Sequence, residues 1–362
     1  MKFCETITTR FMTSNKLSNI GHGGLFFAAL IVIAMCITAI LARPENKDYD
    51  FALLEISDLE TLTIPAYIPT YIQDSVLMKS VNIYLNRYKP PHAFILLMDA
   101  ESGDILAWGQ RNDDQHSEEP TFLQRDSFPA ASLAKIVTAT AALENDSNSK
   151  SEVPKIGRNS TLYKRQIFPK EEDYKGSTIT LEDAFAKSNN PAMGIIGINL
   201  GKSELQNAAE KLGFKNFNYP DSAYYLAESA SGFTQRNTLS PLQIANAIRS
   251  LVFVQAPEDF KKQTYDEMRT LFLRTVSDGT AKTYMRKSVH SRNRDAFDIG
   301  GKTGSLDGNS PAGRYDWFAG FAQSKNEPEK GVVIVVMQVH GTMRNQHSST
   351  IAGLLINEWA KR

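Results

Sequence analysis

The sequence is organised around Phe128-Pro-Ala-Ala-Ser-Leu-Ala-Lys135, which continues as an apolar, alanine-rich run to Leu143. A run of this length and composition predicts a buried helix, and Pro129 just ahead of it is compatible with a helix start. Ser132 should lie in the first turn of that helix. Lys135 follows three residues later, so we expect its side chain on the same helix face.

A serine and a lysine on one face of a buried helix can act as nucleophile and base. A hydroxyl is a weak nucleophile until a neighbour takes its proton, and a lysine can do so once burial lowers its pKa. The pair alone is also compatible with an ordinary hydroxyl and a lysine whose ammonium reaches solvent. The same spacing recurs at Ser147 and Lys150, where no apolar helix follows and we expect a solvated loop.

Length and composition restrict the possible classes of protein. The 362 residues allow one large domain or two modest ones, and an apolar content of 42% is enough for a sizeable core. Lys and Arg together number 40, and so do Asp and Glu. This zero net charge gives no support for a polyanionic partner, so we expect no nucleic-acid binding.

The run from Gly24 to Ala42 contains no charged residue and has a length that suits a bilayer-spanning helix. Basic residues predominate before this run and acidic residues after it, which predicts a cytoplasmic tail at 1–23 and an extracytoplasmic remainder. We therefore expect a single-pass protein of the cytoplasmic (inner) membrane. A cleaved signal peptide is the alternative, but the run is long for a signal core and Ile40-Leu-Ala42 is a poor cleavage site.

Residues 43–90 are expected to form a stem that ends in a helix near 74–88, and residues 91–362 the main domain. Two strands begin this domain and three end it, and we predict them at His92–Ala100, Ile105–Gly109, Phe297–Gly300, Trp317–Phe321 and Val332–Val339. Helices are predicted between and after them, at Leu181–Lys187, Lys202–Leu212, 241–251, Thr264–Val276 and Ser348–Lys361. The pattern favours an α+β fold, in which an antiparallel sheet of about five strands is flanked by helices and carries an inserted helical subdomain.

Three short motifs follow one another along this domain. Ser132-Leu-Ala-Lys135 comes first, Ser188-Asn-Asn190 lies at a break between a helix and Pro191, and Lys302-Thr-Gly-Ser305 follows a strand-like stretch. Each motif is weak alone, but their order and settings together are typical of penicillin-binding proteins and class A β-lactamases. From about Ala93 onward the sequence resembles the transpeptidase domain of penicillin-binding proteins.

Further segments are similar to the high-molecular-mass transpeptidases of this family: Met98–Ala107, Leu181–Asn190, Ser240–Ala245, Asp278–Ala281 and Trp317–Gly320. The chain departs from the family pattern at Ser305, where many transpeptidases have threonine, although the hydroxyl is kept. Class D β-lactamases usually carry valine at the position of Asn190.

The resemblance implies a role for each motif residue in peptidoglycan cross-linking. Ser132 would attack the carbonyl of the penultimate D-Ala of a stem peptide, and Lys135 would take its proton. Ser188 would relay a proton to the leaving group, and Lys302 would add positive potential beside Ser188. The expected substrate-binding residues are Asn190, Thr303, Gly304 and Ser305. The resemblance also implies that the backbone N–H groups of Ser132 and Ser305 form an oxyanion hole.

The resemblance implies stem peptides ending in D-Ala-D-Ala and β-lactam antibiotics as ligands, and no cofactor. The chain has no room for a glycosyltransferase domain, so another protein would have to supply that activity. Alternatives with the same fold are a D,D-carboxypeptidase and a β-lactamase, and a non-catalytic β-lactam sensor or scaffold is a further alternative. No loop glutamate stands out as a base for deacylation, and residues 1–23 are too few for a cytoplasmic output domain.

The sequence does not support a nucleotide-binding or a metal site. Ala296-Phe-Asp-Ile-Gly-Gly-Lys-Thr303 is similar to a relaxed phosphate-binding loop, but no helix follows it as such a loop requires. The six histidines show no metal-binding spacing, so no metal site is expected.

Overall fold

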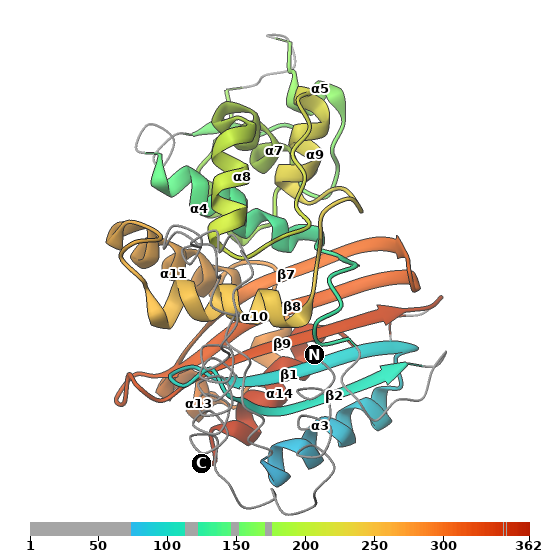
Figure 1. Ribbon diagram of the computed structural model, residues 1–362, viewed down its shortest axis with the longest axis vertical. Coiled ribbons are helices and arrows are strands. Elements are labelled where there is room, and N and C mark those ends of the chain that lie inside the picture. The colour runs from blue at the N-terminus through green and yellow to red at the C-terminus, as the bar shows by residue number, and fades with distance from the viewer. Residues whose placement is uncertain (1–73, 113–121, 146–151, 171–175, 343, 345) are drawn as a thin grey trace, which may run out of the picture. The chain divides into compact units, whose positions relative to one another are not determined.

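The computed structural model describes residues 74–112, 122–145, 152–170, 176–342, 344 and 346–362. Within these residues, five long strands form one antiparallel sheet in the order β2-β1-β9-β8-β7 (Figure 1). The bounds of the strands are β1 His92–Asp99, β2 Ile105–Asn112, β7 Phe297–Asn309, β8 Ala312–Ser324 and β9 Gly331–His340. The α+β fold and the sheet built from both ends of the domain are confirmed.

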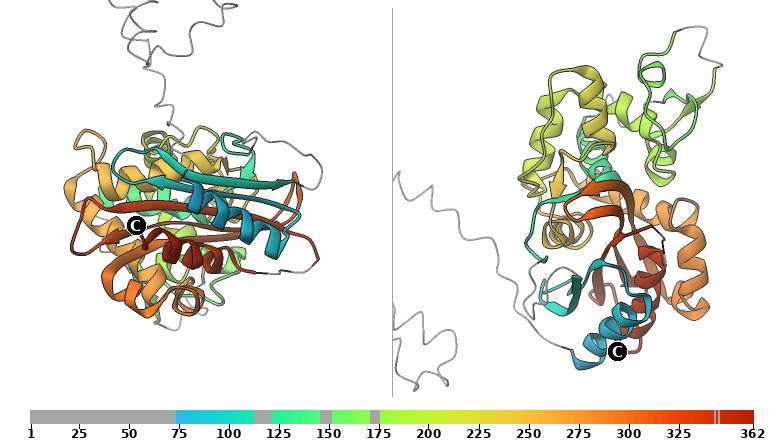
Figure 2. Two further views of the ribbon diagram at one scale, coloured as in Figure 1. Left: turned by 90° about the horizontal axis from the view of Figure 1, so that it is seen from below. Right: turned by 90° about the vertical axis from the view of Figure 1, so that its right-hand side faces the viewer.

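The sheet is buried on both faces because its strands are apolar at consecutive positions. On β1, Phe94, Leu96 and Met98 enter one core cluster, whereas their neighbours Ala93, Ile95 and Leu97 enter the other. One face is covered by α3 (Ser75–Tyr88), α12 (Lys282–Ser288) and α14 (Ser348–Trp359), and α3 and α14 lie side by side in Figure 2. The other face packs against α10 (Pro241–Arg249) and α11 (Lys262–Ser277), and α4 (Lys135–Glu144) belongs to the same core cluster.

Local sequence explains where several helices begin. The Asp74 carboxylate accepts hydrogen bonds of 2.9 Å from the backbone N–H groups of Val76 and Leu77, which caps α3. Ser240 and Gln243 form a reciprocal capping box ahead of α10. These helices, and the predicted helices that correspond to α8, α11 and α14, are confirmed.

A helical region lies beside β7, the edge strand of the sheet (Figure 1). Besides α4 it contains α5 Lys164–Ile167, α6 Leu181–Ala186, α7 Asn190–Leu200, α8 Lys202–Lys211 and α9 Ala223–Ser231. Two small ribbons accompany it, β3 (Phe128–Pro129) paired with β6 (Thr238–Leu239) and β4 (Val153–Pro154) paired with β5 (Thr178–Ile179). The short helix α13 (Ser291–Ala296) leads into β7.

The structure differs from the expected elements in two places near the motifs. The helix of the first motif begins as a 3₁₀ turn at Ala131–Ala134, and α4 itself begins at Lys135, so Ser132 lies in the 3₁₀ turn. Strand β7 continues to Asn309, so Lys302–Ser305 lies inside a strand and does not follow one. Pairing with β8 over the whole length of β7 stabilises a glycine-rich segment that has little strand propensity of its own.

Helices α5, α7, α9, α12 and α13 were not predicted. In α7, Gly194 and Gly197 lower helix propensity, but they let α9 pack closely at Ala227 and Ala230. The close packing is a tertiary effect that periodicity does not report.

No helix among the described residues is long and apolar enough to cross a membrane. The predicted anchor at 24–42, and the predicted tail and stem as far as residue 73, lie outside the described residues.

Candidate active site

The 3₁₀ turn that carries Ser132 is held on two sides. Ala131 adopts a left-handed backbone conformation, with φ of 49°. On β7, Gly304 packs against this turn, and a Cβ there would be in van der Waals contact with the Ala130 carbonyl oxygen at 3.4 Å. The indole of Trp317 donates a 3.1 Å hydrogen bond to the carbonyl of Pro129, which fixes the chain just ahead of the turn. The predicted proximity of the first and third motifs is therefore present.

Lys135 is fully buried and directed at Ser132. Its Nζ lies 2.8 Å from Ser132 Oγ, 2.7 Å from Asn190 Oδ1 and 2.5 Å from the Ser231 carbonyl oxygen. Burial lowers the pKa of Lys135 well below its ordinary value, and the nearby charge of Lys302 lowers it further. Both effects favour the neutral amine, which is the form that accepts a proton.

The partners of Lys135 decide where the lone pair of that amine points. A neutral amine has two N–H donors and one lone pair, whereas the Asn190 Oδ1 and the Ser231 carbonyl can only accept. Both donors are therefore used on these two acceptors. The lone pair is left facing the hydroxyl of Ser132, the one partner that has a proton to give. This is the geometry of a base beside its nucleophile.

Ser188 and Lys302 form a second serine–lysine pair. Lys302 Nζ donates hydrogen bonds to Ser188 Oγ at 3.1 Å and to the Thr303 carbonyl at 3.0 Å. The ammonium also lies 5.5 Å from the centre of the Phe185 ring. Burial lowers the pKa of Lys302 to about 7, so a modest change in its surroundings changes its charge near neutrality.

The second motif connects the two pairs. Ser188 has a positive φ of 52°, which turns the chain between α6 and α7. Asn189 then caps α7 by accepting from the backbone N–H of Ala192 at 2.9 Å. As a result Ser188 reaches Lys302 while Asn190 reaches Lys135.

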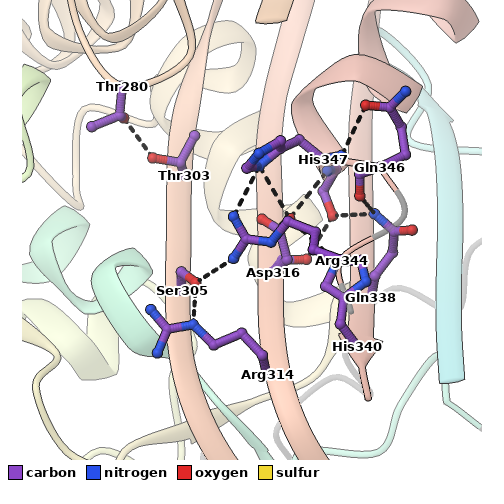
Figure 3. Close-up of polar contacts among 11 residues, drawn as sticks. Thr280, Thr303, Ser305, Arg314, Asp316, Gln338, His340, Arg344, Gln346 and His347 are labelled. Carbon is purple, nitrogen blue, oxygen red and sulfur yellow. Dashed lines mark hydrogen bonds and ion pairs between the residues drawn. The ribbon is translucent and has the colours of Figure 1, made fainter. Parts of the chain in front are cut away.

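The hydroxyls of the third motif have partners of their own (Figure 3). Thr303 Oγ1 lies 2.5 Å from Thr280 Oγ1, which belongs to the segment between α11 and α12. Ser305 Oγ accepts hydrogen bonds from Arg314 Nε at 2.9 Å and from Arg344 Nη2 at 3.1 Å. The structure thus brings Asn190 to the Ser132–Lys135 pair and Lys302 to Ser188, whereas the side-chain contacts of Thr303 and Ser305 are with Thr280 and the two arginines.

Sequence reasoning did not single out several residues that complete the site: Ser231, Gly232, Thr280, Arg314, Asp316 and Arg344. Thr280 and Asp316 lie within or next to segments with family resemblance, so their positions carried a signal. Ser231 acts through its backbone carbonyl and Arg344 through a side chain that follows β9, and neither leaves a recognisable motif.

Comparison with known proteins gives one family and several similar folds. The family model of the penicillin binding protein transpeptidase domain matches residues 93–357. No curated protein is similar enough in sequence to count as a match. Among solved structures, the transpeptidase domain of FtsI4 D,D-transpeptidase from Legionella pneumophila has a TM-score of 0.56 at 15% identity, over 82% of this chain and 98% of that one.

Two further structures share the fold. PBPA from Mycobacterium tuberculosis has a TM-score of 0.60 at 14% identity and covers 80% of both chains. The apo TP domain of Burkholderia pseudomallei penicillin-binding protein 3 has a TM-score of 0.59 at 16% identity, over 82% of this chain and 96% of that one. At these identities the structures show a shared fold, whereas the family match covers most of the chain. The protein therefore belongs to the penicillin-binding protein transpeptidase domain family, whose members are serine acyltransferases.

Proposed function

We propose that this protein is a peptidoglycan D,D-transpeptidase that cross-links stem peptides through an acyl-enzyme at Ser132. The observation that carries the proposal is the 2.8 Å separation between the Ser132 hydroxyl and the buried amine of Lys135. The family implies a peptidoglycan substrate and β-lactam binding, and the shared fold is consistent with both.

In the first half-reaction, Ser132 Oγ attacks the carbonyl carbon of the penultimate D-Ala while Lys135 takes the hydroxyl proton. The negative charge that develops on the carbonyl oxygen needs nearby donors. The N–H groups of Ser132 and Ser305 are suitable because the first lies in a helix start and the second on an edge strand, where alternate N–H groups have no sheet partner.

Bond cleavage then requires a proton on the leaving nitrogen of the terminal D-Ala. Ser188 supplies it from its hydroxyl, and the neighbouring ammonium of Lys302 favours the transfer by its positive charge. Asn190 has its Oδ1 on Lys135, which leaves its amide N–H₂ group as a donor for a substrate carbonyl. Thr303, Gly304 and Ser305 form the β7 segment along which the terminal carboxylate binds.

In the second half-reaction, an amine from another stem peptide attacks the acyl ester and restores the Ser132 hydroxyl. Water as acceptor would make the protein a carboxypeptidase, and fast attack of water on a β-lactam adduct would make it a β-lactamase. The polar contact between Asn190 and Lys135 argues against the dry lysine pocket on which class D β-lactamases depend.

The charge pattern of the N-terminal region supports a placement in the cytoplasmic membrane, with the catalytic domain outside and 24–42 as the anchor. A glycosyltransferase carried by another protein would then provide the glycan strands. Retention in the membrane fraction at high salt would support the anchor, whereas a mature N-terminus near Arg43 would indicate a cleaved signal peptide.

The test of the activity is incubation of the full-length protein in detergent with a stem pentapeptide and an amine acceptor, with products identified by mass. We expect a cross-linked amide together with free D-Ala, and neither product from Ser132→Ala. Release of D-Ala without a cross-link would show a carboxypeptidase. Absence of both products, together with no labelling by penicillin, would exclude an acyl-enzyme function.

A further inference from the structure

Ser305 differs from the other hydroxyls of the site because two arginines donate to it. Arg314 on β8 gives its Nε, and Arg344, which follows β9, gives its Nη2, at 2.9 and 3.1 Å (Figure 3). A hydroxyl oxygen has two lone pairs and one hydrogen. With both lone pairs engaged, the Ser305 hydroxyl can serve a ligand only as a donor, and its hydrogen must point away from both guanidinium groups.

Each arginine is itself held in place. The Nε of Arg344 lies 3.5 Å from Asp316 Oδ2, and its Nη1 lies 3.1 Å from Nδ1 of His347, whose ring is 3.8 Å from that of Tyr284. All three nitrogens of this guanidinium are therefore used. On the other side, the Nη1 of Arg314 pairs with Asp307 Oδ2 at 3.1 Å.

The sheet explains why these groups meet. Residues paired across antiparallel strands project to the same face, so Ser305, Asp316 and Gln338 form one row across β7, β8 and β9. Asp307, Arg314 and His340 form the next row.

Asp316 is the buried anchor of this arrangement, with 7% of its side chain exposed. Burial alone would raise its pKa, but the nearby His340 Nε2 at 3.4 Å and His347 Nδ1 at 3.5 Å, together with the charge of Arg344, lower it to about 2. The carboxylate is thus ionised and able to hold Arg344 at neutral pH.

The simpler interpretation is that both arginines only tie the end of the β7–β8 hairpin together. Three observations favour a role at the site. Gly304, the residue next to Ser305, packs against the turn that carries the nucleophile. Thr303 and Ser305 lie on the same face of an edge strand. Two positive charges on one hydroxyl also make it a stronger donor, since hydrogen bonds in a chain polarise one another.

We infer that Arg314 and Arg344 are positioning residues, which fix the Ser305 hydroxyl as a donor to an anionic group of the ligand. The inference rests on the proposed function and makes it more specific. Stem peptides with a free terminal carboxylate should acylate the enzyme faster than stem peptides whose terminus is amidated or esterified. A neutral terminus gives the oriented Ser305 hydroxyl no anion to bind.

The experiment compares acylation by benzylpenicillin, which has a carboxylate, with acylation by its methyl ester, which has none. Full-length native protein and the variants Arg314→Gln and Arg344→Gln are mixed with each probe, and the adduct is followed by mass. We expect each substitution to lower the acylation rate by benzylpenicillin about tenfold, as for the loss of one charge-assisted hydrogen bond. The acylation rate with the methyl ester should change less than about twofold, because the ester offers the Ser305 hydroxyl no carboxylate to bind.

A double variant tests whether the arginines act through Ser305. In a Ser305→Ala background, Arg344→Gln should have less than about a twofold further effect on either probe. A full tenfold effect in that background would mean that Arg344 meets the ligand directly, and equal losses for both probes would mean a purely structural role. Either result would overturn the inference.

Matched controls separate these outcomes from misfolding. Arg269 pairs with Asp298 near the start of β7 at 2.9 Å, so Arg269→Gln removes a similar ion pair from the same strand away from the site, and we expect neither rate to change. Arg314→Lys and Arg344→Lys keep the charge and should recover part of the benzylpenicillin rate. If the native protein reacts with neither probe, the proposed acyl-enzyme function fails, which is a different result from the loss of selectivity.

Discussion

Gly232 lies so close to Ala131 that a Cβ at position 232 would overlap the carbonyl oxygen of Ala131. Gly232 also has a positive φ of 68°, a conformation that disfavours other residues. Both residues are neighbours of proposed site residues. Ala131 precedes Ser132, the proposed nucleophile, and Gly232 follows Ser231, whose carbonyl accepts a hydrogen bond from Lys135.

Gly232→Ala should therefore impair the site more than the fold. We expect a loss of about 1–3 kcal/mol in the free energy of unfolding, from backbone strain, and a fall of at least tenfold in penicillin acylation as the Ser132 turn is displaced. Denaturant melting and adduct kinetics measure the two effects. Gly176→Ala is the control, since Gly176 has a similar φ of 72° but open space around its Cβ position. A Gly232→Ala protein that acylates at the native rate would show that this contact does not position Ser132.

Removal of the proposed base should abolish acylation while Ser132 remains. We expect Lys135→Met to lower the rate with labelled penicillin by about 10²–10⁴-fold, the usual contribution of a positioned base. The matched control is Lys187→Met, because Lys187 is half exposed and pairs with Asp183 on the protein surface. Stopped-flow fluorescence measures the rates, and a near-native rate in Lys135→Met would require another group to activate Ser132.

Acylation should decline as pH rises through about 7, the pKa to which burial lowers Lys302, because the charge beside Ser188 is then lost. The decline is not unfolding. An unfolded lysine keeps its proton up to about 10.5, so between these values the unfolded state binds more protons and this group's contribution to stability increases with pH. Lys302→Arg stays protonated and should move the decline to higher pH in a pH–rate profile. An unchanged pH–rate profile would mean that Lys302 is not the group whose loss of charge lowers the acylation rate.

Asp316→Asn should destabilise the protein in a pH-dependent way. The pKa of Asp316 is lowered from 3.8 to about 2, so its ionised form contributes stability that is present above about pH 4 and is lost as pH falls toward 2. The difference in unfolding free energy between native protein and variant should be about 2 kcal/mol at pH 7 and should shrink in acid. Urea melts at pH 7 and pH 3 test this, and a difference that does not depend on pH would contradict the assignment.

The β-lactam adduct should be long-lived, because no loop glutamate stands out in the sequence as a base for deacylating water. Loss of label from Ser132 should take minutes to hours, whereas an efficient β-lactamase turns over at about 10 per second or more. Timed mass spectrometry after removal of free label measures the loss. Sustained nitrocefin turnover above about one per second would replace the transpeptidase proposal by a β-lactamase.

The sequence predicted the elements whose signals are local. Strand β1 and helix α3 were predicted nearly to the residue, because a continuous apolar run and the helical spacing of apolar residues ahead of Pro90-Pro91 are short-range features. The three motifs were also found, since each is short and their order along the chain is visible without a structure.

The less regular elements could be located only in the three-dimensional structure. Helix α7 contains glycines that periodicity counts against it, and its stability comes from close packing on α9. The 3₁₀ turn at Ser132 and the long β7 likewise depend on neighbours far away in sequence, namely Gly304, Gly232 and strand β8.

The sequence by itself determined the candidate residues for the proposed chemistry: two serines, two lysines and the amide and hydroxyls beside them. Only the tertiary structure decided how they are paired, with Lys135 on Ser132 and Asn190 and with Lys302 on Ser188. It also showed that Arg314 and Arg344 converge on Ser305. The physical reason is that a pKa, a lone-pair direction and a hydrogen-bond count depend on burial and on partners from distant segments, which no local pattern encodes.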